Sequence, residues 1–270
     1  MSGLSLRLPP LLLIMALGAC GASKPAPKAP KPEAMPPSEF LLLYAGTWTH
    51  SFENPGDPEE VLARLQGTSG DERKKVLRDL AVAHLHAAEG TDDKKAQRKH
   101  RRESDRYARL ASRGRVEDYR RAEMRFVQLW NAWRAGEKKA EKLAETITEE
   151  HRDALDVYNL SWAIRGEIAL DQGHHKEAAS HYRYLLTLIE HPLFTFALYR
   201  TAAIQEDEGR KEDAEQALRE AVNMGCKEDA SKPALEASLA AAAKLGLGAK
   251  LDPKGTARPA SCGAATQDGP

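Results

Sequence analysis

The sequence predicts an all-α protein built as an array of helical hairpins. Alanine, leucine, glutamate, lysine and arginine dominate residues 57–245, a composition that is typical of helical proteins. In the same region apolar positions recur at steps of three and four residues, as they do along one face of a helix. Almost every break between such segments is a glycine, and no segment has the alternating pattern of a strand.

The first 19 residues are typical of a secretory signal peptide. A short start with one positive charge, Arg7, precedes an apolar run from Leu8 to Leu17 that only two prolines interrupt. A helix needs about 20 apolar residues to cross a bilayer, so this run is too short to be a membrane span.

The residues from Leu17 to Cys20 resemble the lipobox of bacterial lipoproteins, in which small residues precede a cysteine. The resemblance implies cleavage before Cys20 and acylation of that residue, which would hold the protein on a membrane. Gly21, in place of Asp, implies by the family's sorting rule the periplasmic face of the outer membrane, with the inner membrane and the cell surface still open. The alternative is an ordinary secreted protein that is cut elsewhere.

Residues 20–37 are predicted to be the lipidated cysteine and a tether. Residues 21–37 contain six prolines and three lysines and have almost nothing to bury. Proline favours the extended polyproline II conformation at about 3.1 Å per residue, so the tether spans up to about 50 Å.

The charge balance gives no reason to expect nucleic acid as a partner. Without residues 1–19, which contain one basic residue, the chain has 39 Lys and Arg against 40 Asp and Glu. The hydrophobic fraction of 41% is in the range of globular proteins that bury a core.

The helices can be placed in order from their caps and periodicity. Residues 38–70 are predicted to hold N-terminal helices, of which the clearest has Asp57 as N-cap, Pro58 in its first turn and an end at Gly67. Further helices are expected at residues 71–89, 92–112, 116–135, 137–149, 153–171, 175–190, 193–208 and 211–223. A C-terminal capping helix is predicted within residues 226–246 and a disordered tail at residues 247–270.

The predicted turns form an internal repeat. Gly90, Gly136, Gly173 and Gly209 each end one helix shortly before the next begins, at intervals of 46, 37 and 36 residues. Periods of this length are typical of arrays of helical hairpins.

Two consecutive segments, LSWAIRGEIALDQGHHKEAASHYRYLLTLIEHP and FALYRTAAIQEDEGRKEDAEQALREAVNMG, carry the pattern of a known helical repeat. On these segments the chain resembles the tetratricopeptide repeat family. The resemblance covers residues 71–225, with the best matches at 155–225, and implies a right-handed superhelical array, a TPR-like α-solenoid. A generic domain of three to five helical hairpins is the alternative. The pattern falls on Trp162, Gly166, Ala169, Gly173, Ala178 and Tyr182, and then on Leu198, Ala202, Gly209, Ala214, Leu218 and Ala221.

In this family the first helix of each hairpin lines a concave groove that binds a partner. The aromatic residues Phe126, Trp130 and Trp133 lie at i, i+4 and i+7, so they form one stripe of the kind that makes binding hot spots. The rival interpretation places this stripe in the core, under the helix at 92–112 or under the N-terminal segment EFLLLYAGTW. The other aligned groove positions are Leu160, Ala163, Glu167, Asp171, Phe196, Tyr199, Ala203 and Glu206.

Catalytic and metal-binding motifs are not apparent. Adjacent histidines such as His174 and His175 cannot both face one ion from a helix, and His84 and His86 point in different directions. We therefore expect no metal, no cofactor and no enzymatic activity.

Two cysteines remain after Cys20. In an oxidising compartment Cys226 and Cys262 are expected to form a disulfide that holds the tail against the last helix; two free thiols are the alternative. Closing a loop of about 37 residues would contribute roughly 3.8 kcal/mol on the chain-entropy model.

Two classes of function follow from these features. The first is a lipid-anchored periplasmic scaffold that binds a peptide or protein partner in envelope assembly, as in barrel, secretin or pilus machinery. The second is an envelope enzyme or small-ligand carrier that uses the helical repeats as a frame.

Overall fold

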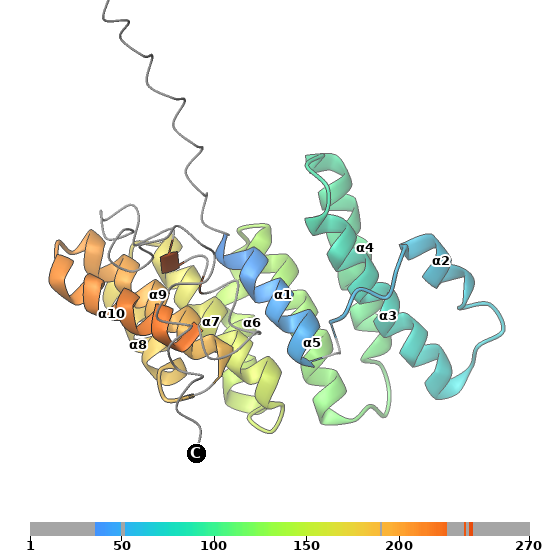
Figure 1. Ribbon diagram of the computed structural model, residues 1–270. Helices are drawn as coiled ribbons and strands as arrows, with labels where there is room; N and C mark the ends of the chain where they lie inside the picture. Colours follow the sequence, from blue (N-terminus) through green and yellow to red (C-terminus); the bar gives the residue numbers. More distant parts are fainter. Residues whose placement is uncertain (1–35, 50–51, 190, 226–234, 236–237, 240–270) are drawn as a thin grey trace, which may run out of the picture. The chain divides into compact units, whose positions relative to one another are not determined.

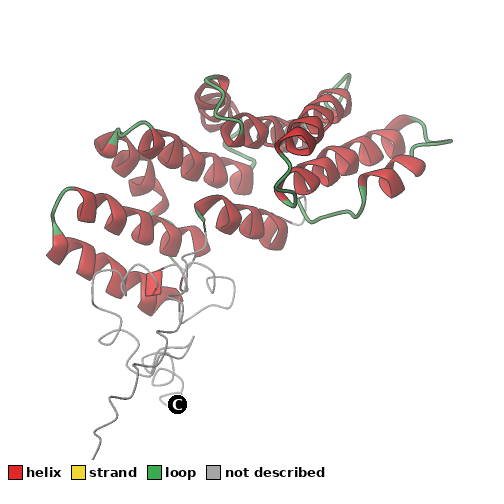
Figure 2. Ribbon diagram, turned by 90° about the horizontal axis from the view of Figure 1, so that it is seen from above, coloured by secondary structure: helices red, strands yellow, loops and turns green. Residues whose placement is uncertain are grey.

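The described part of the protein is entirely helical. The computed structural model describes residues 36–49, 52–189, 191–225, 235, 238 and 239, all within one unit, Glu33–Pro270. These residues form ten helices and no strand, as Figure 1 and Figure 2 show, which confirms the predicted all-α class. The helices are α1 (Pro37–Thr49), α2 (Pro58–Ala63), α3 (Gly70–Glu89), α4 (Lys94–Ala111), α5 (Asp118–Arg134), α6 (Lys139–Glu150), α7 (Leu155–Asp171), α8 (His175–Leu185), α9 (Pro192–Asp207) and α10 (Lys211–Gly225).

From α3 onward the helices pack as consecutive pairs (Figure 1). The pairs are α3 with α4, α5 with α6, α7 with α8, and α9 with α10, and the first helices α3, α5, α7 and α9 also contact one another in sequence. The first helices therefore form a row. Within the described residues, no helix has both the length and the hydropathy that crossing a bilayer requires.

Three of the predicted turns share one geometry. Gly136, Gly173 and Gly209 have φ angles of 66°, 74° and 77°, which glycine adopts most easily. In each turn the glycine N–H binds the carbonyl three residues back, and the next N–H binds the carbonyl five residues back. Gly90 has a φ of −85°, so the α3–α4 connection is built differently, and Asp93 caps α4 there by accepting from the N–H of Lys95.

The small residues of the repeat pattern allow close packing. An added Cβ on Gly166 would lie 2.3 Å from Cε1 of Tyr182, so α7 and α8 approach as closely as they do only because this residue is glycine. Ala178, Ala202 and Ala214 are likewise buried between helices.

Two predicted helices are too long. The helix expected to end at Gly67 ends as α2 at Ala63, and residues 64–67 form turns. The segment expected at 175–190 ends as α8 at Leu185. His191 lies just before Pro192 and has an extended conformation, with φ −108° and ψ 138°, because a residue that precedes proline is disfavoured in a helix.

The C-terminal predictions are tested only in part. Leu235, Ser238 and Leu239 are helical, and Leu235 packs against α10 beside Gly225. Cys20, the tether up to residue 35, Cys226, Cys262 and the tail at 247–270 lie outside the described residues, so the lipid anchor and the disulfide stay predictions.

Candidate functional site

The row of first helices carries the N-terminal helix on the face that the sequence predicted to be a partner groove. Helix α1 packs against α7 in the middle of the row. The ring of Phe40 stacks on Phe196 of α9, with 4.9 Å between ring centroids and 5° between ring planes. Phe40, Leu41, Tyr44 and Ala45 are all buried, so one side of α1 is in contact along two turns.

A hydrogen bond fixes α1 at the start of α9. The Tyr44 hydroxyl lies 2.9 Å from Nε2 of His191, the N-cap residue of α9. Nδ1 of His191 accepts from the backbone N–H of Leu193, so in the neutral ring Nε2 carries the proton and donates to Tyr44. Burial lowers the pKa of His191 and raises that of Tyr44, which keeps both groups neutral.

Phe52, which follows α1, extends the contact toward the other end of the row. Its ring lies 5.0 Å from that of Phe126 on α5, and its carbonyl accepts from Nε2 of His86 on α3 at 2.7 Å. Between them, α1 and Phe52 therefore touch α9, α7, α5 and α3. A chain segment running across the first helices is the arrangement expected of a bound partner, but here it belongs to the same chain.

This arrangement corrects the expectation of an open groove. Phe126, Trp130, Glu167 and Phe196 are buried, as are Leu160 and Ala163, so none of these predicted groove residues lies on a free surface. Phe126 does occupy a core position, as the rival interpretation has it, but the ring against it belongs to Phe52, which follows the segment EFLLLYAGTW. Trp133, Tyr199 and Ala203 are half-buried, and Asp171 and Glu206 are exposed near the ends of their helices.

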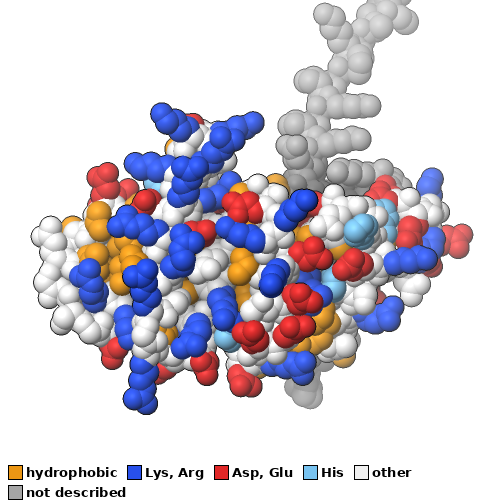
Figure 3. All heavy atoms as spheres, turned by 180° about the vertical axis from the view of Figure 1, so that it is seen from behind, with side chains coloured by type: hydrophobic (Ala, Val, Ile, Leu, Met, Phe, Trp, Pro, Cys, Tyr) orange, Lys and Arg blue, Asp and Glu red, His pale blue; other side chains and the backbone are white. Residues whose placement is uncertain are grey.

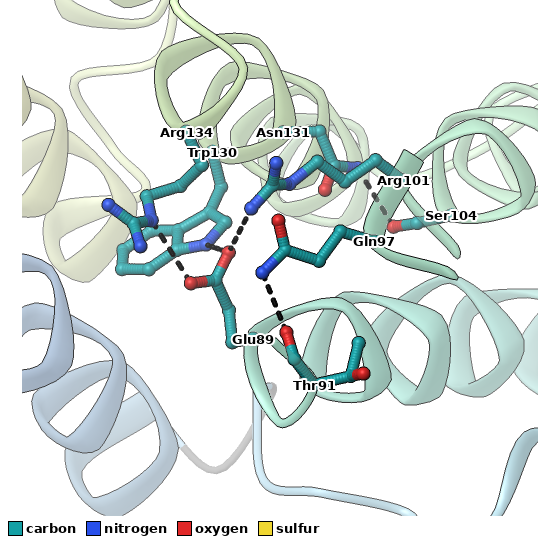
Figure 4. Close-up of polar contacts among 8 residues, drawn as sticks. All are labelled: Glu89, Thr91, Gln97, Arg101, Ser104, Trp130, Asn131 and Arg134. Atoms are coloured by element: carbon teal, nitrogen blue, oxygen red, sulfur yellow. Dashed lines mark hydrogen bonds and ion pairs between the residues drawn. The ribbon is translucent and has the colours of Figure 1, made fainter. Parts of the chain in front are cut away.

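Trp130 belongs to a polar junction of three helices, drawn in Figure 4. The Glu89 carboxylate, at the end of α3, accepts from Nε1 of Trp130 at 3.4 Å and from Nη2 of Arg101 at 3.2 Å. Its second oxygen accepts from Nε of Arg134 at 3.0 Å. Because these donors come from α4 and α5, the junction fixes the α3–α4 pair against the next pair.

The junction continues deeper between α4 and α5. The amide of Asn131 donates to Oγ of Ser104 at 2.9 Å, and Ser104 donates in turn to the carbonyl of Ala81 on α3 (Figure 4 shows the first of these bonds). Ser104 and Asn131 are buried, and polar groups buried in a core need hydrogen-bond partners of this kind.

Glu167 is the buried charge at the centre of the row. Arg200 of α9 binds it with two parallel bonds, of 2.7 and 2.9 Å, and Tyr182 of α8 donates its hydroxyl to the same carboxylate. Burial raises the pKa of the Glu167 carboxyl, and the Arg200 guanidinium acts in the opposite direction. Glu167 thus ties α7 to both neighbouring helices rather than facing a ligand.

His84 and His86 have structural partners. Nδ1 of His84 lies 2.9 Å from Nδ1 of His100 on α4, and the His84 ring stacks on Tyr107. Burial and the neighbouring His100 lower the pKa of His84 to about 4. Within the described residues, no group of three or more His, Cys, Asp or Glu side chains is arranged to hold a metal ion.

Comparisons with known proteins add no homologue. No family model, no curated protein and no solved structure matches the chain.

Proposed function

We propose that the chain is a scaffold of helical repeats whose α5–α7–α9 face recognises a helix, and that α1 holds this face until a partner helix replaces it. The observation that carries the proposal is the position of α1: it lies on the aligned groove face and makes the kind of contact that a partner would make.

The contacts of α1 define the chemistry of the partner. Phe40 and Tyr44 are four residues apart, so they form one stripe on the helix, and Leu41 and Ala45 widen it. The face offers Phe196 as a stacking ring and His191 as a polar partner for the stripe. A partner segment should therefore be an apolar helix with two aromatic residues at i and i+4, one of which has a hydroxyl group.

Several features support α1 as a replaceable element. It is not part of any of the hairpin pairs, and the residues between Thr49 and Pro58 that connect it to α2 are not assigned to a helix where they are described. Leu43, on its outer side, is 46% exposed, so α1 is a thin layer over the row.

The proposed location adds a mechanical link. The lipobox-like sequence supports acylation of Cys20 at the outer membrane, and the proline-rich tether ends where α1 begins. In this arrangement α1 connects the lipid anchor to the groove, because the tether leads into the helix that covers the groove. Such a scaffold would act in envelope assembly, with a protein or peptide partner.

The test is capture of a synthetic peptide of residues 36–53 by the full chain, measured by fluorescence anisotropy. In the wild-type chain the resident α1 blocks the face, so binding should be weak. In the variant with Phe40→Ala and Tyr44→Ala, loss of the Phe40 ring alone should destabilise the packing of α1 on the face by about 3–5 kcal/mol. The peptide should therefore bind this variant at least tenfold more tightly than the wild type.

Two controls keep the test specific. Leu43→Ala, on the exposed side of the same helix, should leave peptide binding as in the wild type. A peptide with both aromatic residues replaced by alanine should not bind any variant. If the peptide binds none of the chains, while the double variant still unfolds cooperatively, α1 is a fixed part of the core and the proposal is wrong.

A further inference from the structure

Helix α4 is unlike the rest of the chain in charge. The whole protein has equal numbers of basic and acidic residues. Helix α4 has eight Lys and Arg and only two acidic residues, Glu103 and Asp105. One helix therefore has a local excess of six positive charges, and the question is which surface or ligand these charges face.

The cations form a row along the open side of α4. Lys95, Arg98, Arg102 and Arg109 recur at steps of three, four and seven residues, and all are exposed. From Lys95 to Arg109 the row is about 21 Å long at 1.5 Å per residue, and Arg113, just beyond the end of the helix, is also exposed. The opposite side of α4 is buried against α3 and α5. Figure 3 shows Lys and Arg side chains projecting together from the upper part of this face.

The row is largely uncompensated. Arg106 pairs with Glu103 at 2.9 Å, and Arg101 is directed inward to Glu89. Among the described residues, no ion pair involves Lys95, Arg98 or Arg102. The charges of this row are therefore available to an external anion.

A pocket continues the basic surface at the end of α4. It has a volume of about 470 Å³ and an apolar floor of Ala111, Val116 and Met124. Its walls carry five cations, three of which already have acidic neighbours: Lys74 in Asp71, Arg78 in Glu123 and Arg120 in Glu117. Lys75 and Arg115 are exposed at the rim. The pocket is large enough for a phosphate head group with a short apolar part.

We propose that the α4 row docks on an anionic phospholipid surface and that the adjacent pocket receives one phosphate head group. A straight row on an exposed helix matches a flat surface, whereas exposed aromatic rings for stacking on single-stranded nucleic acid are missing among the described residues of α4, where Tyr107 is buried. Each Lys or Arg near an anionic membrane contributes about 1 kcal/mol. The proposal depends neither on acylation of Cys20 nor on displacement of α1.

The binding test uses the full chain with Cys20→Ser, so that no acyl chain contributes. Co-sedimentation is measured with vesicles of equal parts phosphatidylglycerol and phosphatidylcholine, and with vesicles of phosphatidylcholine alone. The chain should prefer the anionic vesicles, and the preference should fall as salt rises, because at 0.1 M salt charges are screened beyond about 10 Å.

Matched variants locate the surface. Lys95→Gln, Arg98→Gln and Arg102→Gln together should weaken binding to anionic vesicles about a hundredfold, at about fivefold for each cation. Lys142→Gln, Lys176→Gln and Arg183→Gln remove the same charge from exposed positions on α6 and α8 and should change binding less than about twofold for each cation. All six positions are exposed, so both triple variants should keep the wild-type melting temperature.

A second pair of substitutions tests the pocket. Lys75→Gln with Arg115→Gln should weaken binding to phosphatidylglycerol vesicles about tenfold, and should abolish any stabilisation of the chain by inorganic pyrophosphate. If pyrophosphate stabilises the wild type but vesicles do not bind, the ligand is a soluble phosphate and the lipid surface is wrong.

Other outcomes would overturn the proposal. If both triple variants lose vesicle binding equally, the effect is one of net charge rather than of α4. A different ligand would also overturn it. If the wild type binds polyglutamate or duplex DNA but not anionic vesicles, and the α4 triple variant loses that binding, the row binds a protein or a nucleic acid instead.

Discussion

Helices α7 and α4 differ in what surrounds them. Helix α7 contacts five others, α1, α5, α6, α8 and α9, whereas α4 packs against α3 and α5 among the described helices. Apolar and small residues accordingly occur all round α7, and its buried charge, Glu167, has buried partners. Helix α4 buries only four residues and exposes its cations except Arg101. A helix in this fold therefore tolerates substitutions where it faces water and does not tolerate them where a second layer of helices covers it.

The largest expected effect breaks the charge network of α7. Glu167→Gln leaves the Arg200 guanidinium buried without its counter-ion and should lower the free energy of unfolding by about 3–5 kcal/mol. The matched change on α4, Glu103→Gln, removes an exposed pair with Arg106 and should cost about 0–1 kcal/mol. Urea unfolding followed by circular dichroism measures both. If both variants lost the same free energy of unfolding, burial under neighbouring helices would not be what distinguishes α7 from α4.

A smaller effect tests the close approach of α7 and α8. Gly166→Ala should lower the free energy of unfolding by about 1–2 kcal/mol, because the new methyl group displaces the ring of Tyr182. This value is the net loss that remains after alanine's gain of about 1 kcal/mol in helix propensity over glycine. Lys99→Ala, which creates the same residue on the open side of α4, should change the value by less than about 0.5 kcal/mol. A Gly166→Ala chain as stable as the wild type would mean that Tyr182 has room to move.

The smallest effect concerns pH and the layer that covers α7. His191 has a lowered pKa in the folded chain, so its contribution to stability is complete above the ordinary histidine pKa of about 6.5 and is lost as pH falls through the folded value. Protonation of Nδ1 would break the cap to Leu193. The protection factors of the α1 amides, which allow for the slower intrinsic exchange at lower pH, should therefore fall between pH 7 and pH 5.

A non-titrating variant isolates this effect. His191→Asn keeps an N-cap acceptor and should remove part of the pH dependence of exchange in α1. His84, whose pKa is lowered to about 4, is present in both chains and cancels in the comparison. If wild type and variant respond to pH identically, His191 does not control the contact of α1.

The helices and their turns could be predicted from the sequence because the signals are local. Asp57 as N-cap with Pro58 after it, and the turn glycines at Gly136, Gly173 and Gly209, act within a few neighbouring residues. The error at the end of α8 is also local, since the pattern of apolar residues continued past Leu185 while Pro192 determined the backbone before it.

The candidate site could not be predicted in the same way. Periodicity shows which face of a helix is apolar, but it does not show whether a partner or another part of the chain covers that face. Phe126 and Phe196 were assigned to a groove for this reason, although Phe52 and Phe40 cover them. The pairing of His84 with His100 was missed because it depends on the register between two helices, which neither helix determines alone.

The contact between Tyr44 and His191 joins residues 147 positions apart. At a synthesis rate of about 5–20 residues per second, His191 is made roughly 7–30 s after Tyr44. During that interval the aromatic stripe of α1 lacks its partners His191 and Phe196, so the first helix to be made is among the last to settle. A newborn chain thus displays Phe40 and Tyr44 to whatever chaperone meets it, and closure of α1 over α9 reports that the hairpins are complete.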